Sequence, residues 1–458
     1  MKISTLLKGI LGTIRLEGPA TQPSFTGTVG STAPFVPATM NPAPPDMMGL
    51  GLFQVVQTRE TFPYDTINAH YLGLTDGRAI YVCGNRFAGK TALGQAIAVS
   101  LLSRYKSNGA RRRLYAEIQR RNQGIAELDK LLHRLGGEIT TLKGGGINLL
   151  APNLLPITDQ TDLIKRSLEL LSRTTLTARQ GNMLTHSMKL VYKDKLHVPC
   201  LSVLARLLLD VNVEDALSYL GCAGSTRLHH LEEARLLVAA SREVAAMVRD
   251  LSELGCLGDT VSVEQAMKAQ VFAPDFTDLT DEETIILQMY LWRIRMHAIA
   301  VHDEDLFFNV EIHDENYKMT RYAVYTQGMM DFLKAIRGAD IVVVAISHRP
   351  NDYRTVAANG TVAYEQAMNL LNEYDTCITG RLPESSRDDM KMFFGFTDDQ
   401  FDIVLGLKQP RFVIKFRNQE DIHEVRLRLT RGLRETSYSH GATENEFIPN
   451  DEEQPDDR

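Results

Sequence analysis

Short, mainly apolar runs mark the first and the last thirds of the chain. Such runs, roughly four to eight residues long, are typical of strands that are buried on both faces of a parallel sheet. The runs predicted to be strands are 79–83, 113–118, 139–142, 306–313, 341–346 and 376–379. Helical patterns at 91–105, 125–135 and 317–336 lie between them. This alternation predicts an α/β fold with a mostly parallel sheet, closed at one edge by an antiparallel pair, 411–416 and 424–429.

The region from 158 to 300 has a different pattern. Leucine and valine recur there at helical spacing, and strand patterns are nearly absent. We therefore expect an all-helical insertion between the two parts of the α/β core, which are 47–157 and 301–436. A chain of 458 residues is long enough to hold such a second unit beside one core.

Both ends of the sequence lack the pattern of a packed core. Residues 17–46 are rich in Pro, Thr, Ser and Gly, which predicts a flexible linker, and 437–458 is predicted to be a disordered acidic tail. The first residues instead place Ile and Leu at helical spacing with Lys2, Lys8 and Arg15 between them. We expect a short amphipathic helix before the linker, within 1–46, that packs on the body of the protein or docks at a membrane surface or a partner.

Composition and charge exclude several classes of protein. A net charge of −7 and a pI near 6.0 are not those of a protein that coats nucleic acid, so DNA contact would need a local basic cluster. The dense basic cluster is Lys106 with 111–113, and a solvated loop is its other interpretation. No apolar run reaches the roughly 18 residues that cross a bilayer. Five cysteines without CxxC spacing fit a reducing compartment, so we expect a cytoplasmic protein.

The sequence Gly-Asn-Arg-Phe-Ala-Gly-Lys-Thr at 84–91 matches the phosphate-binding loop GxxxxGK[ST]. In such a loop backbone N–H groups and the start of the next helix hold the phosphates, with Lys90 on the β- and γ-phosphates and Thr91 on Mg²⁺. A predicted strand before the loop and a helix after it supply the context that the motif requires. The candidate nucleotide-binding residues are Gly84, Asn85, Arg86, Phe87, Ala88, Gly89, Lys90, Thr91 and Ala92. A glycine-rich turn without nucleotide is the alternative.

A carboxylate pair at the end of a neighbouring strand would complete a site for ATP and Mg²⁺. Asp314 is the candidate metal ligand, and Glu315 is the candidate base that activates the attacking water. The pair follows a bounded, β-prone segment, whereas the competing acidic run at 303–305 continues a helical pattern. Without a phosphate loop in the chain, the pair would be interpreted as the cap of the next helix.

The apolar run 341–346 ends in Ser347, His348 and Arg349. Because strand ends in an open α/β sheet face the ligand crevice, these side chains are further candidates. His348 would sense the γ-phosphate or position the water, and Arg349 would stabilise transferred charge in its own site or a neighbour's. A loop with surface side chains is the alternative interpretation.

Together these segments resemble the C-terminal ATPase domain of the large conjugation ATPases of type IV secretion systems, in the HerA–FtsK superfamily. The segments that carry the resemblance are 61–65, 84–91, 135–138, 146–149, 312–315 and 347–350. The resemblance implies a RecA-like P-loop core that hydrolyses ATP with Mg²⁺ as a homo-hexamer. It also implies work at the inner face of the cell membrane on a membrane-embedded secretion channel. Arg349 and Arg381 are then the candidates for an arginine finger, which would make both catalytic beside Lys90, Glu315 and His348.

The sequence departs from the family pattern at several positions. Phe87 stands where the family usually has Gly, His348 replaces a Gln, and no Asp-Pro follows the strand at 113–118. Residues 1–45 are too few to supply the large N-terminal domain of the full-length family. The leading hypothesis is a motor for conjugation or type IV secretion. The alternatives are a DNA-translocating or coupling ATPase of the same superfamily and a non-catalytic nucleotide-binding assembly protein.

Overall fold

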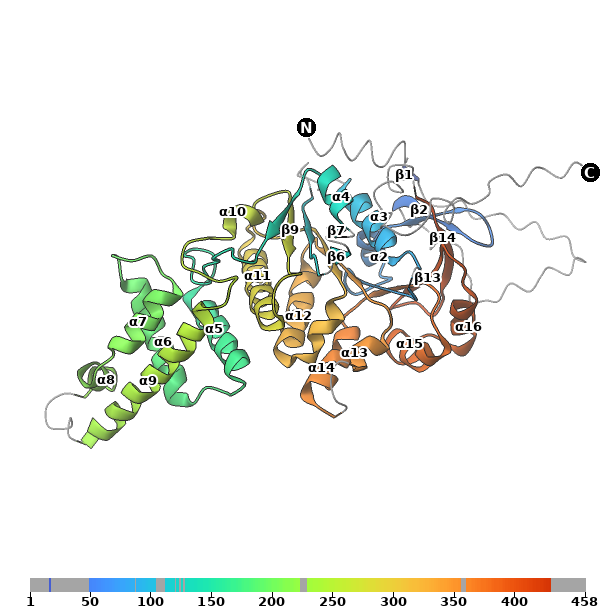
Figure 1. Cartoon of the computed structure of the whole chain (residues 1–458). Coiled ribbons are helices and arrows are strands. Elements are labelled where there is room, and N and C mark those ends of the chain that lie inside the picture. Colours follow the sequence, from blue (N-terminus) through green and yellow to red (C-terminus); the bar gives the residue numbers. More distant parts are fainter. Residues whose placement is uncertain are drawn as a thin grey trace, which may run out of the picture.

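A computed structural model of the chain shows one large sheet with helices on both faces and a helical arm at one end (Figure 1). The residues that the structure describes are 16–17, 49–86, 88–103, 112–119, 121–122, 125–126, 128–222, 229–355 and 360–429. Phe87, the predicted amphipathic helix, nearly all of the predicted linker and the predicted acidic tail lie outside these residues.

Parallel strands form the middle and one end of the 12-stranded sheet. In spatial order they are β12 (Thr376–Thr379), β4 (Ala79–Cys83), β11 (Val342–Ile346), β10 (Val310–Asp314), β5 (Leu114–Ala116), β9 (Val271–Asp275) and β8 (Glu138–Thr141). Most of their side chains are buried on both faces, which is why apolar residues dominate these runs in the sequence. The predicted α/β class with a mostly parallel sheet is confirmed.

Antiparallel strands extend the sheet beyond β12. They are β13 (Arg411–Phe416), β14 (His423–Leu427), β2 (Gly49–Val55), β1 (Leu16–Glu17) and β3 (Thr61–Tyr64). The predicted antiparallel pair is thus present as β13 and β14, but it does not form the edge, because β2 pairs with β14 and carries β1 and β3. A short hairpin of β6 (Arg121–Asn122) and β7 (Ile125–Ala126) stands apart from this sheet.

Two layers of helices cover the sheet. Helices α3 (Lys90–Leu102) and α4 (Asp129–Arg134) pack on one face against alternate strand residues such as Val82, Ile312 and Val344. The other face is covered by α11 (Asp281–Val301), α12 (Ala323–Ala335), α13 (Asn351–Thr355), α14 (Val362–Leu371), α15 (Arg387–Phe394) and α16 (Asp398–Gly406). Since successive strand residues face opposite layers, 312 and 314 lie on the α3 side while 311 and 313 lie on the α11 side. Short helices α2 (Thr66–Tyr71), η2 (Asn316–Arg321), η3 (Ile336–Gly338) and η4 (Glu384–Ser386) complete the core.

The helical arm stands away from the sheet and is drawn in green in Figure 1. Its helices are α5 (Ile157–Ser172), α6 (Ala178–Lys193), α7 (Leu201–Asp210), α8 (Val213–Tyr219) and α9 (Leu231–Ser252). The chain then returns through α10 (Glu264–Met267) to strand β9, which pairs with β5 and β8. The prediction that 158–300 is all helical is therefore wrong at β9. Pro274 lies within this strand, and a proline in a short run argues against a strand in any sequence-based assignment.

Candidate functional site

The predicted site residues follow four neighbouring strands that end at one edge of the sheet. The residues that lie side by side in register at these ends are Asp314, Ile346, Val82 and Ile378. Backbone hydrogen bonds then join the loops that follow. The Gly84 N–H donates to the His348 carbonyl at 3.0 Å, and the Asn85 N–H donates to the Arg381 carbonyl at 2.8 Å. The fold thus brings together segments that are up to three hundred positions apart in the sequence.

The phosphate loop has the backbone that its motif predicts. Gly84 and Gly89 adopt φ values of +151° and +82°, which favour glycine. A Cβ on Gly84 would lie 3.1 Å from the Ala88 Cβ and 3.2 Å from the Gly380 Cα, so the loop is folded closely against the end of β12. Helix α3 begins at Lys90 with no side-chain cap among the described residues. Its first N–H groups are therefore suited to an anion at the loop.

Lys90, His348 and Glu315 form a line of polar contacts across this edge. The Lys90 side chain is 8% exposed, and its Nζ lies 3.3 Å from the His348 Nδ1 and 3.1 Å from the Asn85 carbonyl oxygen. On its other side the His348 Nε2 lies 3.5 Å from the Glu315 Oε1. The Glu315 carboxylate also contacts Lys318. Three of the predicted catalytic residues are therefore neighbours in space.

Glu315 occupies an unusual backbone conformation. Its φ of 51° and ψ of 26° lie in the left-handed region, which costs a residue with a side chain roughly 1–2 kcal/mol. The Glu315 N–H still donates to the Ile346 carbonyl at 3.0 Å, so the residue continues the pairing of β10 with β11 before the chain turns into η2. Such conformations occur where the surrounding structure requires them, often at functional sites. The turn directs the carboxylate toward His348.

The competing acidic run at 303–305 lies elsewhere. It follows the end of α11 and precedes β10, so the whole length of this strand separates it from Asp314. Five strand residues span roughly 13–17 Å. The pair at 314–315, and not this run, therefore lies at the strand ends that carry the phosphate loop.

The two candidate arginine fingers lie on different sides of the phosphate loop, and both are exposed. Arg349 follows β11, and its backbone N–H donates to the Asp352 carboxylate at 2.9 Å. Burial raises the pKa of the Asp352 carboxyl. Arg381 follows β12 and lines a pocket beside the loop.

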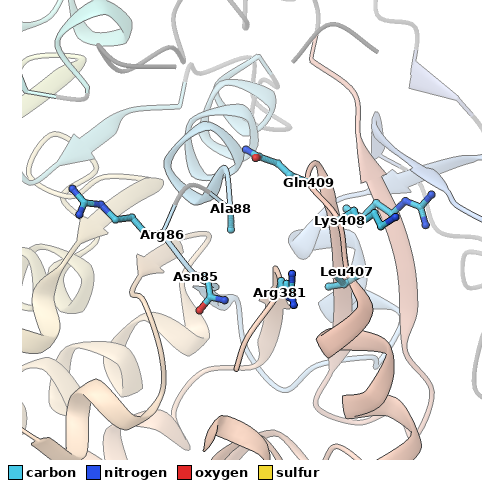
Figure 2. A pocket seen from close by; sticks show the side chains of 8 residues that line it. Asn85, Arg86, Ala88, Arg381, Leu407, Lys408 and Gln409 are labelled. Carbon is cyan, nitrogen blue, oxygen red and sulfur yellow. The ribbon is translucent and has the colours of Figure 1, made fainter. Parts of the chain in front are cut away.

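This pocket, of about 410 Å³, was not foreseen from the sequence. Figure 2 shows Asn85 and Ala88 on one side and residues of two other segments on the opposite side. Its lining residues are Asn85, Arg86, Ala88, Arg381, Leu407, Lys408, Gln409 and Arg411. Four of these eight side chains are basic, which favours a ligand with anionic or polar groups. The 407–411 segment carries no motif, so only the fold reveals its place next to the loop.

A second unforeseen feature is a set of buried charges on the α11 side of β10. Glu117, Arg295, Glu311 and His313 are at most 1% exposed. Burial alone would lower the pKa of His313, but the carboxylates of Glu117 and Glu311 outweigh burial and raise that pKa to about 9. Burial alone would raise the pKa of Glu117, but His313 and Arg295 hold that pKa below its usual value. Two carboxylates thus face two cations.

The basic cluster proposed for DNA contact takes a different role in the structure. Arg112 forms a 2.7 Å ion pair with Asp340 and its side chain is 6% exposed. Arg113 donates to the carbonyl oxygens of Glu304 and Phe307, each at 3.0 Å. These two arginines therefore belong neither to a solvated loop nor to a surface available to DNA. Lys106 and Arg111 lie outside the described residues.

Loss of the Arg112–Asp340 pair is expected to affect stability and leave the loop intact. Replacing Arg112 by Ala leaves the partly exposed Asp340 carboxylate, just before β11, without this partner, and loss of one hydrogen bond between charged groups costs about 1.5–3 kcal/mol. Denaturant unfolding of the variant beside wild type measures the loss. Arg179→Ala is the control, because its ion pair with Glu233 is exposed and worth roughly 0–1 kcal/mol. Equal losses in the two variants would contradict the assignment.

Comparison with known proteins adds evidence on the fold. A scan against protein-family models and a search of curated proteins found no match to this sequence. Among solved structures, VirB4 of Thermoanaerobacter pseudethanolicus aligns with a TM-score of 0.57, covering 87% of this chain and 100% of that chain at 14% identity. This chain has the fold of that VirB4 structure. The resemblance to type IV secretion ATPases with a RecA-like P-loop core is thus confirmed at the level of the fold.

The plasmid coupling protein TrwB in complex with ADP and Mg²⁺ is also similar. The alignment covers 82% of this chain and 89% of that chain at 14% identity, with a TM-score of 0.48. Among the described residues, no helix has both the length and the apolar character needed to cross a bilayer.

Proposed function

We propose that this chain is an ATP-hydrolysing motor subunit of a conjugative or type IV secretion system. The observation that carries the proposal is the meeting of the phosphate loop, Lys90, His348 and the 314–315 pair at one edge of the sheet. A group of strand ends with a helix N-terminus, a buried lysine and adjacent carboxylates is suited to phosphoryl transfer, in which catalysis is mainly positioning and charge stabilisation.

The donor set fits a magnesium ion. Asp314 shares the α3 side of β10 with Ile312, and Thr91 stands in the first turn of α3 on that same side. Carboxylate and hydroxyl oxygens are ligands that Mg²⁺ prefers. Thr91 and Asp314 would therefore hold Mg²⁺, which neutralises phosphate charge when bound.

The remaining residues have distinct roles in the proposed reaction. The loop N–H groups and the Lys90 ammonium bind the β- and γ-phosphates. The Glu315 carboxylate takes a proton from water while the water oxygen bonds to the γ-phosphorus and the bond to the β-phosphate oxygen breaks, giving ADP and phosphate. His348, within 3.5 Å of the Glu315 carboxylate, orients that base. Arg349 or Arg381 would stabilise the transferred charge across a subunit boundary.

The position of the acidic pair also sets the direction of the nucleotide. The γ-phosphate must lie near Asp314 and Glu315, on the β11 and β10 side of the loop. The nucleoside end then leaves on the opposite side, over β12, where the pocket opens beside Ala88 and Arg381 (Figure 2). We infer that this pocket receives the ribose and base.

A substitution in the pocket is expected to separate nucleoside binding from phosphate binding. Leu407→Asp adds a negative charge to the apolar part of the lining, so ATP affinity should fall about tenfold, which corresponds to 1.4 kcal/mol. Inorganic tripolyphosphate has no ribose or base, so it would bind only at the phosphate loop, and its affinity should stay the same. Calorimetry with both ligands measures this difference. Equal losses for the two ligands would place the nucleoside elsewhere.

The proposed cellular setting follows from the family resemblance. We propose a homo-hexamer at the inner face of the cell membrane that works on a membrane-embedded secretion channel. The DNA-translocating alternative drew on the basic cluster, and the engagement of Arg112 and Arg113 within the fold favours the secretion motor over it.

Steady-state hydrolysis and nucleotide binding by the purified chain test the proposal. We expect ATP binding that Mg²⁺ strengthens, followed by release of ADP and phosphate. Tight binding without turnover, also at high protein concentration and with channel components present, would favour the non-catalytic assembly protein. An absence of nucleotide binding would refute the proposed function altogether.

A further inference from the structure

The buried charges behind β10 form one connected network. The His313 Nδ1 lies 3.0 Å from the Glu117 Oε1, and the His313 Nε2 lies 3.0 Å from the Glu311 Oε2. The Arg295 Nη1 lies 3.1 Å from that same Glu311 oxygen. Gln288 donates to the second Glu117 oxygen at 3.0 Å. The site chemistry proposed above uses none of these residues.

Stability alone does not explain this network. Taking charged groups out of water is expensive, and apolar residues of similar volume often stabilise such a core as well or better. Aromatic rings already surround the cations, since the Arg295 guanidinium lies 4.0 Å from the Tyr115 ring centroid and 4.8 Å from that of Phe332. An apolar side chain at position 295 would fit these rings. The charges therefore call for a role beyond holding the core together.

The network joins the site strand to α11, the helix that follows β9 and packs against α5 of the helical arm. Glu311 and His313 belong to β10, which ends at Asp314, whereas Arg295 belongs to α11. Two positions earlier on α11, Arg293 donates to the Asp159 carbonyl in α5 at 3.2 Å and contacts the Asp162 carboxylate. A set of polar contacts on α11 thus links the arm to the strand that ends at the acidic pair.

We propose that Glu117, Arg295 and Glu311 are positioning residues, which fix β10 against α11 and β5 so that the 314–315 pair keeps its geometry for metal-bound nucleotide. The inference rests on the proposed ATPase function. It makes α11 the element through which the helical arm acts on the site. Replacing residues that hold metal ligands in position typically lowers metal affinity or activity by roughly 10- to 100-fold. We expect an effect of this size here.

The test is a double variant that removes one charge of each sign. In R295M/E311Q the methionine keeps the volume between the rings, and the glutamine amide oxygen that replaces the Glu311 carboxylate still accepts from the histidine. Thermal unfolding should stay close to wild type, and ATP affinity in EDTA should be unchanged. The gain in ATP affinity on adding Mg²⁺ should fall by roughly 10- to 100-fold. A variant that folds and keeps the full magnesium effect overturns the inference.

Two further variants keep the test decisive. R112M/D340N removes a second ion pair, which lies at the amino-terminal ends of β5 and β11, away from the site. This variant should leave the magnesium effect unchanged. If R295M/E311Q does not fold, R295K replaces it. Lysine keeps the charge but not the planar fork, so it should retain part of the magnesium effect, and a full effect would overturn the inference. Wild-type protein without Mg²⁺-dependent ATP binding would instead refute the proposed function.

Discussion

Glu315→Gln is expected to lower steady-state ATP turnover by roughly 10²- to 10⁴-fold, the usual contribution of a positioned general base. The amide cannot take a proton from water, yet it keeps the shape of the carboxylate beside His348. Nucleotide binding should therefore persist. Phosphate release and ATP affinity, measured on the same preparation, separate the two effects.

Glu304→Gln is the matched control for this change. It alters the same residue type in the competing acidic run, which precedes β10 and lies a strand length away from Asp314. Its turnover should equal that of wild type. Turnover that survives Glu315→Gln but falls in Glu304→Gln would move the catalytic carboxylate and contradict the site described here.

Lys90→Ala is expected to weaken ATP binding by roughly 10- to 100-fold and to remove measurable turnover. A hydrogen bond from a charged donor contributes about 1.5–3 kcal/mol, so the net loss of one such bond to the phosphates accounts for this weakening. The side chain is already buried and held between His348 and the Asn85 carbonyl, so its ammonium needs little ordering to reach them. Calorimetric titration with ATP measures the loss.

Lys318→Ala is the control that distinguishes direct phosphate binding by Lys90 from a general attraction of nucleotide by positive charge. Lys318 pairs with the Glu315 carboxylate and is half exposed, so its removal deletes a cation without touching the phosphate loop. ATP affinity should change little. Equal losses in the two lysine variants would mean that the site attracts nucleotide by charge alone.

The sequence predicted those parts of the strand and loop backbone that local chemistry determines. The run at 79–83 became β4 with the same bounds, because a strand buried on both faces needs an unbroken apolar segment. Gly84 and Gly89 were assigned from the turn they permit, and the structure gives both the expected positive φ. The choice of Glu315 over Glu304 followed from the same reasoning about bounded strands.

Features that depend on distant segments were missed. Strand β9 contains Pro274, and it belongs to the sheet because β5 and β8 flank it. The pocket needs 407–411 beside the loop, and the buried network needs Arg295 opposite Glu311. Each side chain has an ordinary local context, so only the tertiary pairing gives it a role. For Arg113 the local context was misleading. It belongs to a basic run that is typical of a solvated loop, but its guanidinium donates to backbone carbonyl groups within the fold.

The strand order has a consequence for synthesis of the protein. Strand β4, which carries the phosphate loop, has only β11 and β12 as neighbours in the described sheet, and both are encoded more than 250 positions later. In a ribosome-bound chain shorter than about 379 residues, this apolar strand therefore lacks at least one of its two neighbouring strands. Long-range strand pairing of this kind is slow, and it leaves apolar segments exposed that can aggregate. We therefore expect the phosphate loop to reach its final structure only after the last third of the chain has been synthesised, and chaperones to assist the chain until then.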